Sequence, residues 1–168
     1  MARKVSAARR KTDAAARKKK SGAAPAADLG PLGGWIGFYL RMAQIASFQA
    51  FARRTREHDL NPGRFAALMV IGKNPDISQT VLSQAIGLDK SSLTPAIDSL
   101  ARRGLVRRTR TATDKRAYRL RLTAAGEGIL RELTACAQAH DRDLDAIVGR
   151  QRPAVLRALK RIVETLGS

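Results

Sequence analysis

Residues 82–126 read LSQAIGLDKSSLTPAIDSLARRGLVRRTRTATDKRAYRLRLTAAG, and they carry the most specific structural pattern of the chain. The pattern predicts two short helices joined by a tight turn at Gly87. The apolar residues Leu93, Ile97 and Leu100 of the second helix recur at the spacing of one helical face. Two short helices joined in this way are typical of a helix-turn-helix.

The second helix, predicted over residues 89–103, carries a polar face suited to nucleic acid. Its outward residues are cations and hydrogen-bond donors, the groups that contact phosphates and base edges. They are Lys90, Ser91, Ser92, Thr94, Ser99, Arg102 and Arg103. Pro95 leaves the start of the helix open. A cap at Asp89 puts the proline past the first turn, where it loses a hydrogen bond. A cap at Ser91 or Ser92 removes most of that conflict.

A β-hairpin is predicted directly after this helix, with its arms at residues 105–111 and 117–122. In the second arm apolar residues alternate with arginines, which is the period of a strand with one buried face. The polar loop between the arms carries Lys115 and Arg116. A hairpin in this place is a wing, and a cationic wing tip suits the narrow, electronegative minor groove of DNA.

The chain is strongly basic. Its 168 residues hold 32 Lys and Arg against 14 Asp and Glu, which gives a net charge of +18. Residues 64–122 alone carry twelve basic and four acidic side chains, whereas a merely solvated surface would be mixed in sign. This excess predicts a polyanionic partner, double-stranded DNA. No nucleophile elbow, glycine-rich phosphate loop or pair of carboxylates stands out, so we do not expect an enzyme.

Composition separates a tail from the folded part. Residues 1–28 carry nine Lys or Arg, two Asp and little apolar content besides alanine, so they cannot bury enough surface to fold. We expect a basic, disordered tail and linker at residues 1–33 and a folded part at residues 34–168. The single cysteine indicates a reducing compartment, and we expect the cytoplasm.

Metal and cofactor sites are not expected. Cys136, His58 and His140 lack the spacing of metal ligands. Cys136 has apolar neighbours and is expected to be an ordinary buried thiol, and the two histidines are expected at the surface or at an interface.

Helices predicted at residues 34–57 and 123–167 flank the winged helix-turn-helix at residues 62–122. They hold more apolar surface than so small a winged domain can cover. A homodimer interface accounts for it and would place two recognition helices about one DNA turn, roughly 34–36 Å, apart. A nineteen-residue, largely apolar stretch in the first helix also raises the question of a membrane span. Arg41 near their centre would cost on the order of 2.5–3.5 kcal/mol in a bilayer, so we reject a span.

Four motifs follow one another in a recognisable order. They are Leu93-Thr94-Pro95, LARRGLVRR at residues 100–108, Asp114-Lys115-Arg116, and LTAAG at residues 122–126. In these motifs the sequence resembles the multiple-antibiotic-resistance (MarR) family of winged-helix regulators. The resemblance implies a mostly α fold with a small β-hairpin wing, in which a winged helix-turn-helix domain joins a helical dimerisation region. It also implies a homodimeric repressor that binds a pseudo-palindromic operator and releases it when a small molecule binds.

The resemblance further assigns roles to residues. Contacts from the recognition helix would fall on Ser91, Ser92, Thr94 and Pro95. Arg102 and Arg103 would lie nearer the DNA backbone or the buried end of the helix. In the wing, Asp114 would pair with Arg116, and that arginine would reach the minor groove.

Relatives of this kind usually bind effectors between the dimerisation helices and the winged domain, and many respond to aromatic acids or their coenzyme A thioesters. An anionic aromatic ligand would satisfy Arg41, the only charge in an aromatic-rich stretch. The candidate ligand-binding residues are Trp35, Phe38, Tyr39, Arg41, Met42, Phe48 and Phe65. In the alternative, the aromatic residues form the dimer core and Arg41 pairs with an acidic residue across the interface.

Two other functions stay open. An architectural protein that binds DNA without sequence preference would be equally basic, although it would not need a recognition helix. A redox-sensing repressor would use Cys136, although nothing cationic adjoins this residue in the sequence to activate its thiolate.

Overall fold

The computed structural model describes residues 27–110 and 118–167. The described residues divide into two units between residues 39 and 40, which we describe separately. The first unit contains a 3-10 helix, η1 (Gly30–Gly34), where the sequence predicted a linker. It also holds the start of α2 (Ile36–Arg54), which continues into the second unit. Helix α2 is therefore shorter than the first helix predicted from the sequence, at residues 34–57.

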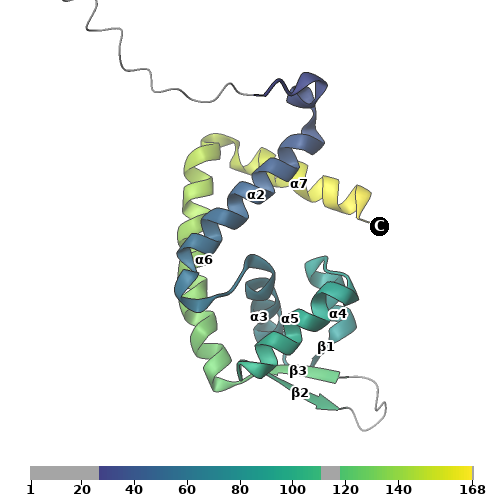
Figure 1. Ribbon diagram of the computed structural model, residues 1–168, viewed down its shortest axis with the longest axis vertical. Coiled ribbons are helices and arrows are strands. Elements are labelled where there is room, and N and C mark those ends of the chain that lie inside the picture. Colours follow the sequence, from purple (N-terminus) through teal and green to yellow (C-terminus); the bar gives the residue numbers. More distant parts are fainter. Residues whose placement is uncertain (1–26, 111–117, 168) are drawn as a thin grey trace, which may run out of the picture. The chain divides into compact units, whose positions relative to one another are not determined.

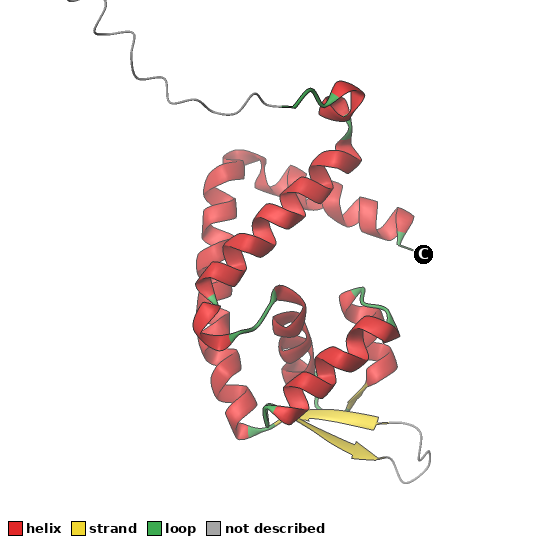
Figure 2. Cartoon of the chain, viewed as in Figure 1, coloured by secondary structure: helices red, strands yellow, loops and turns green. Residues whose placement is uncertain are grey.

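The second unit is built from helices and one small sheet (Figures 1 and 2). After α2 its elements are η2 (Arg56–His58), α3 (Pro62–Lys73), β1 (Ile77–Ser78), α4 (Gln79–Ile86), α5 (Lys90–Arg102), β2 (Val106–Arg110), β3 (Tyr118–Leu122), α6 (Ala124–Val148), η3 (Gly149–Gln151) and α7 (Arg152–Leu166). This is the predicted fold class, a mostly helical chain with a winged helix-turn-helix.

The sheet has three antiparallel strands in the order β1-β3-β2. The predicted hairpin is confirmed, and its register pairs Val106 with Leu122. The third strand, β1, pairs Ile77 with Leu120 and was not predicted from the sequence. Two residues are too few to show the alternation that identifies a strand.

Side-chain caps fix where the helices begin. The Asp89 carboxylate accepts a hydrogen bond from the Ser92 amide at 2.8 Å, so α5 begins at Lys90 and Pro95 lies inside it. This decides between the two starts that the sequence left open. Thr123 caps α6 in the same way through the Gly126 amide at 3.0 Å.

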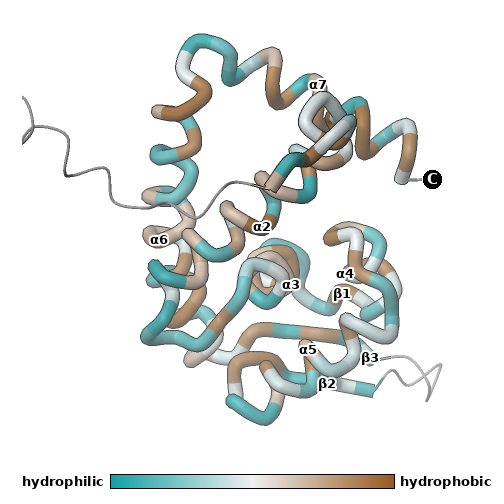
Figure 3. Tube along the Cα trace, turned by 45° about the horizontal axis from the view of Figure 1, so that its top comes forward, coloured by the Kyte–Doolittle hydropathy of each residue, from teal (hydrophilic) through white to brown (hydrophobic). Residues whose placement is uncertain are grey.

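Leucines and isoleucines from α3, α4, α5, the sheet and α6 form one core. The predicted stripe of Leu93, Ile97 and Leu100 is fully buried in it. Leu133 of α6 is also fully buried there, so the winged helix-turn-helix shares its core with the long helix that follows. Figure 3 shows hydrophobic and hydrophilic residues alternating along α6 and α7, as in amphipathic helices.

Candidate nucleic-acid interface

The start of α5 presents a polar surface. The residues predicted there as DNA contacts are all exposed: Lys90, Ser91, Ser92, Thr94 and Pro95. Gln79 at the start of α4 donates to the Thr94 hydroxyl at 3.2 Å, which links the two helices of the helix-turn-helix. Gly87 ends α4 at a φ of 65°, in the left-handed region that favours glycine.

Asp89 organises the two serines of this surface. Its carboxylate accepts hydrogen bonds from the Ser91 hydroxyl at 2.5 Å and from the Ser92 hydroxyl at 3.0 Å. These bonds, together with the one from the Ser92 amide, lower the pKa of Asp89 to about 2. Because both hydroxyl hydrogens point at Asp89, the serines turn acceptor lone pairs outward. Such acceptors match the exocyclic amino groups of adenine and cytosine in the major groove.

The two arginines at the end of α5 differ in their surroundings. Arg103 donates to the carbonyl oxygens of His58 at 2.6 Å and Asp59 at 3.2 Å, so its guanidinium anchors the end of α5 to η2. Arg102 is exposed. Arg103 is exposed as well, and the expected position of these arginines near the DNA backbone or the buried end of the helix stays a prediction.

An ion pair joins α5 to the wing. Arg108 on β2 donates to the Asp98 carboxylate on α5 at 2.5 Å, and both side chains are partly buried. The Tyr118 ring of β3 lies 5.8 Å from the Arg108 guanidinium and 5.9 Å from that of Arg110, within cation-π distance. The pairing of Arg108 with Asp98 was not predicted from the sequence. Its signal was Asp98 itself, the only acidic residue of α5.

The predicted wing-tip residues lie outside the described part of the chain. They are Asp114, Lys115 and Arg116. Their predicted pairing and their reach into the minor groove therefore stay predictions.

A pocket of about 330 Å³ opens beside the start of α5. It is lined by Phe48, Asn61, Gly63, Arg64, Leu88, Ser92, Pro95 and Ala96. Phe48 is a predicted ligand-binding residue, whereas Ser92 and Pro95 belong to the predicted DNA-contacting surface. A ligand in this pocket would therefore touch the recognition helix.

Arg64 gives this pocket a positive charge that sequence analysis missed. It is partly buried, and its Nε atom is buried with no hydrogen-bond partner in residues 27–110 and 118–167. Arg64 also lies in the first turn of α3, after the Asn61 cap, where the helix dipole favours acidic residues. A cation at this unfavourable position, after the Asn61 cap, could have indicated from the sequence that Arg64 has a functional role. The arrangement suits an anionic ligand.

The other candidate ligand residues lie elsewhere. In the first unit, Trp35 and Tyr39 are exposed, and Phe38 packs edge to face on Tyr39 at 5.4 Å. In the second unit, Arg41 and Met42 are exposed. Phe65 packs against Phe51 at 5.5 Å. Because Arg41 is exposed in the single chain, the predicted cost of a buried cation does not arise there.

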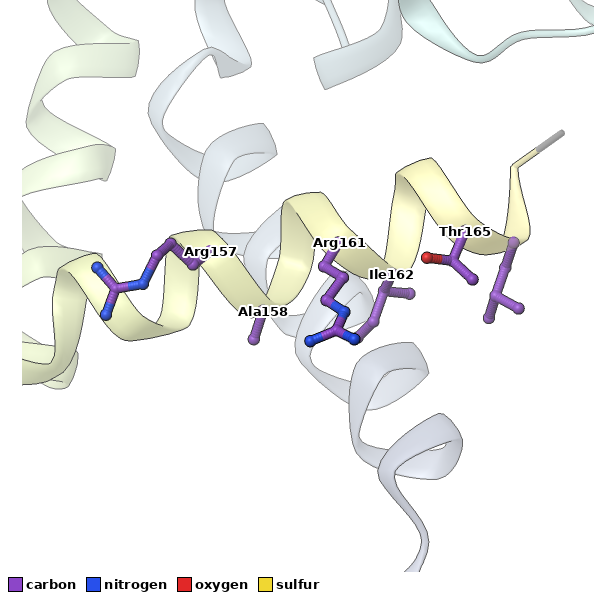
Figure 4. A pocket seen from close by; sticks show the side chains of 6 residues that line it. Arg157, Ala158, Arg161, Ile162 and Thr165 are labelled. Carbon is purple, nitrogen blue, oxygen red and sulfur yellow. The ribbon is translucent and has the colours of Figure 1, made fainter.

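Helix α7 leaves an apolar face uncovered. Leu159 is 41% exposed, Val163 69% and Leu166 78%, although they follow one another along one side of the helix. A neighbouring surface hollow of about 640 Å³ is lined by α7 residues alone (Figure 4). Figure 4 shows Arg157, Ala158, Arg161, Ile162 and Thr165 along α7. So much exposed apolar surface on an amphipathic helix indicates a protein interface.

His140 and Cys136 of α6 both contact α2. His140 is buried, and its Nε2 lies 2.9 Å from the Ser47 hydroxyl, so the expectation of a surface or interface position was wrong. Cys136 is partly buried, and its thiol donates to the Arg54 carbonyl oxygen at 3.7 Å.

Neither a metal site nor a membrane-spanning helix occurs in the described residues. No group of His, Cys, Asp and Glu side chains in them could hold a metal ion. None of their helices has the length and apolar character that crossing a membrane requires.

Comparison with known proteins gives relatives of one kind. A model of the MarR family matches residues 58–117. The chain is 35% identical over 135 residues to a putative transcriptional regulatory protein for the hcr operon of Thauera aromatica. That match covers 79% of this chain and 81% of the relative.

Solved structures of similar proteins include CouR and PcaV. CouR bound to a 23-mer DNA duplex is 30% identical with a TM-score of 0.74, and the match covers 81% of this chain and 97% of CouR. CouR bound to p-coumaroyl-CoA is 26% identical with a TM-score of 0.73, covering 82% and 96%. PcaV from Streptomyces coelicolor, in complex with its natural ligand, is 26% identical with a TM-score of 0.75, covering 88% and 100%. With its winged helix-turn-helix and a relative this similar over most of both sequences, the chain belongs to the MarR family of transcriptional regulators, which are not enzymes.

Proposed function

We propose that this protein is a homodimeric repressor that binds a pseudo-palindromic operator and releases it when an anionic aromatic effector binds. The observation that carries the proposal is the start of α5, where the Asp89 cap holds Ser91 and Ser92 as an exposed polar surface. CouR, a similar protein, has been solved on a DNA duplex, which supports DNA as the partner. The proposal divides the chain as the sequence suggested, into a tail at residues 1–33, flanking helices and a winged domain at residues 62–122.

DNA recognition is proposed to use the start of α5 and the wing. Ser91, Ser92, Thr94 and Pro95 read base edges in the major groove, while Lys90 and Arg102 contact phosphates. In the wing, Lys115 and Arg116 reach the minor groove, and Asp114 holds Arg116. The role first given to Arg103 has less support, because its guanidinium already bonds two carbonyl oxygens of the chain.

The homodimer is proposed from the uncovered face of α7. Burial of the exposed leucine and valine side chains of this helix would stabilise the protein by about 25 cal/mol per Å² of apolar surface removed from water. A second copy of the chain covers such a surface with closed symmetry. Two copies present two recognition helices to two half-sites, which is what a pseudo-palindromic operator requires.

The effector is proposed to be an aromatic carboxylate or its coenzyme A thioester. A volume of about 330 Å³ is at the lower end for ligand pockets, so the pocket takes an aryl group rather than a whole thioester. Phe48 would contact the ring, and the Arg64 guanidinium would bind the anionic end or the thioester carbonyl. The complexes of PcaV with its natural ligand and of CouR with p-coumaroyl-CoA support small-molecule control.

The remaining aromatic residues belong to this proposal with less support from the fold. Arg41 is the residue to test among them, because it is the cation of the predicted set. If Arg41→Ala leaves effector-driven release of DNA unchanged, Arg41 does not bind the anion.

Fluorescence anisotropy tests the proposed function. The purified protein is titrated into a duplex from upstream of its own gene and into a scrambled duplex at near-physiological salt. A preference of about a thousandfold or more for one site supports an operator-specific regulator. Near-equal binding across several genomic duplexes would contradict it and favour an architectural DNA-binding protein.

A further inference from the structure

Three arginines share the solvent side of the winged sheet. Along β2 and β3, Val106 and Leu120 turn into the core, so the residues next to them turn to the opposite side. Arg107, Arg119 and Arg121 lie on that side and are exposed. We call these three residues the outer sheet face.

The register brings like charges together on this face. Arg107 on β2 lies directly opposite Arg121 on β3, and Arg119 lies opposite Thr109 one position further along the same side. Like charges directly opposite each other destabilise a sheet. An anion bound at this surface would offset the repulsion.

One acidic residue supplies part of that offset. The Asp76 carboxylate accepts a hydrogen bond from Arg121 Nε at 2.8 Å and another from Arg121 Nη2. Its carbonyl oxygen accepts from Arg119 Nη1 at 3.0 Å. The bonds from Arg121 hold the pKa of Asp76 below its ordinary value. Asp76 therefore positions both arginines of β3.

The backbone at Asp76 adopts the left-handed conformation. Its φ is 66°, in the region that Asp and Asn enter more readily than other non-glycine residues. The Asp76 amide donates to the Leu120 carbonyl oxygen at 3.0 Å, which ties this residue to β3.

The outer sheet face retains more positive charge than Asp76 neutralises. Three guanidinium groups face one carboxylate, and no ion pair found in residues 27–110 and 118–167 includes Arg107. Guanidinium groups match phosphate in shape and bind it with paired hydrogen bonds. Several arginines spaced along a surface can bind a row of phosphates, one guanidinium to each phosphate.

The position of this face indicates which phosphates it meets. The inner side of the wing faces α5, because Arg108 on that side bonds Asp98 of α5. The outer sheet face therefore looks away from the recognition helix. A duplex that receives the wing tip in its minor groove has a backbone on each side of the wing, and the one beyond the wing is nearest this face.

We propose that the outer sheet face binds backbone phosphates of duplex DNA flanking each operator half-site, and that Asp76 positions Arg119 and Arg121 for this contact. The inference rests on the proposed function, because it needs the wing to lie on DNA. It extends the footprint beyond the bases that α5 reads and adds no sequence preference.

The test compares two operator duplexes with the full-length protein. One duplex ends at the outer edges of the two half-sites, and the other continues about one helical turn further on each side. We expect the wild type to bind the longer duplex more tightly and with a steeper salt dependence. Each arginine–phosphate contact steepens the fall of log affinity with log salt concentration by about 0.9. Near 0.15 M salt, one such contact raises the affinity about fivefold.

The variant Arg107→Gln/Arg119→Gln should lose the gain from the longer duplex and keep the affinity for the shorter one. The matched control is Arg131→Gln/Arg142→Gln, which removes the same charge from exposed positions on α6. It should keep the gain. If Arg107→Gln/Arg119→Gln also keeps it, the face does not bind DNA, and an acidic protein segment becomes the alternative occupant. Equal losses on both duplexes would place these arginines inside the half-site and overturn the flanking contact.

A second variant separates positioning from net charge. Asp76→Asn removes a negative charge, so electrostatics alone predicts tighter binding of the longer duplex. Positioning predicts that the gain from the longer duplex shrinks, because asparagine offers one acceptor oxygen in place of the two that Arg121 bonds. Asparagine tolerates the left-handed backbone, and circular dichroism checks that the variant is folded. Tighter binding by Asp76→Asn would overturn the role of Asp76. Failure of the proposed function would appear separately, as equal binding of operator and scrambled duplexes by the wild type.

Discussion

Arg108 and Asp98 form an ion pair between the wing and the recognition helix, with the guanidinium on β2 donating to the carboxylate on α5. This pair fixes the angle between the two elements that are proposed to enter DNA. A wing and a recognition helix that are already fixed relative to each other can enter two grooves at once. No entropy is then lost in fixing their arrangement during binding, which lowers the cost of association.

We therefore expect Asp98→Asn and Arg108→Gln each to weaken operator binding several-fold, with little effect on scrambled DNA. Because both residues act through one contact, the double variant should be no weaker than the weaker single variant. Anisotropy titrations of the four proteins measure this. Asp143→Asn, which breaks the exposed pair with Arg54, is the control. Additive losses from Asp98 and Arg108 would show that they act independently.

Arg64 should control the response to effector. Arg64→Gln removes the cation of the pocket, and a hydrogen bond to a charged group contributes about 1.5–3 kcal/mol. The effector concentration that releases half of the DNA should then rise about ten- to a hundredfold, while affinity for DNA without effector stays close to that of the wild type. Lys73→Gln, at the other end of α3, serves as the control. An unchanged effector response in Arg64→Gln would exclude Arg64 from the effector site.

The apolar face of α7 should hold the dimer together. Val163→Asp places a charge on this face, and sedimentation equilibrium should then show monomers at concentrations where the wild type is dimeric. Operator affinity should fall with it. Lys160→Gln changes an exposed polar position of the same helix and should leave the dimer intact. A dimeric Val163→Asp protein would mean that another surface joins the two copies.

Gly126 should tolerate no side chain. A Cβ atom there would lie 2.0 Å from the Leu105 carbonyl oxygen, where the start of α6 crosses the base of the wing. We expect Gly126→Ala to lower the free energy of unfolding by about 1–3 kcal/mol, measured by urea titration. Gly128 provides a close control, because its nearest neighbour is the end of the Arg131 side chain at 3.9 Å. Gly128→Ala should be neutral or stabilising by up to about 1 kcal/mol. Similar losses in both variants would point to a general effect of alanine in α6.

Asp89 should make stability depend on pH in the acid range. Its pKa is lowered to about 2 by bonds from Ser91 and Ser92, so the folded state favours the carboxylate. The resulting stability is present above the ordinary pKa of 3.8 and is lost as the pH falls through the folded value. Asparagine also caps helices but does not ionise, so the difference between the wild type and Asp89→Asn should shrink between about pH 4 and pH 2. Urea titrations across this range measure it, and a constant difference would contradict the assignment.

The winged helix-turn-helix could be predicted from the sequence because its signals are local. The periodic Leu93, Ile97 and Leu100, the alternating second arm of the hairpin and the Thr123 cap each depend on residues close together in the chain. The start of α5 was ambiguous, because Asp89 and the two serines are all good caps, and only their mutual hydrogen bonds decide among them.

The parts that were missed depend on contacts between distant residues. His140 is buried because Ser47 and Phe51 of α2 pack on it, and no local pattern shows that. Arg64 joins Phe48 in one pocket only because α3 folds back beside α2. The pairing of Asp76 with Arg121 spans 45 residues and follows from the third strand, which two residues could not reveal.

Leu133 lies in α6 but is fully buried in the core of the winged domain. A change in the direction of α6 therefore has to move a side chain that is packed on all sides. Closely packed cores shift between discrete arrangements rather than deforming gradually. We expect a signal that reaches α6 to arrive at the base of the wing as a step between two packings. The protein would then answer a rising dose of ligand by changing the proportion of molecules in each packing, and each molecule would be either fully in one packing or fully in the other.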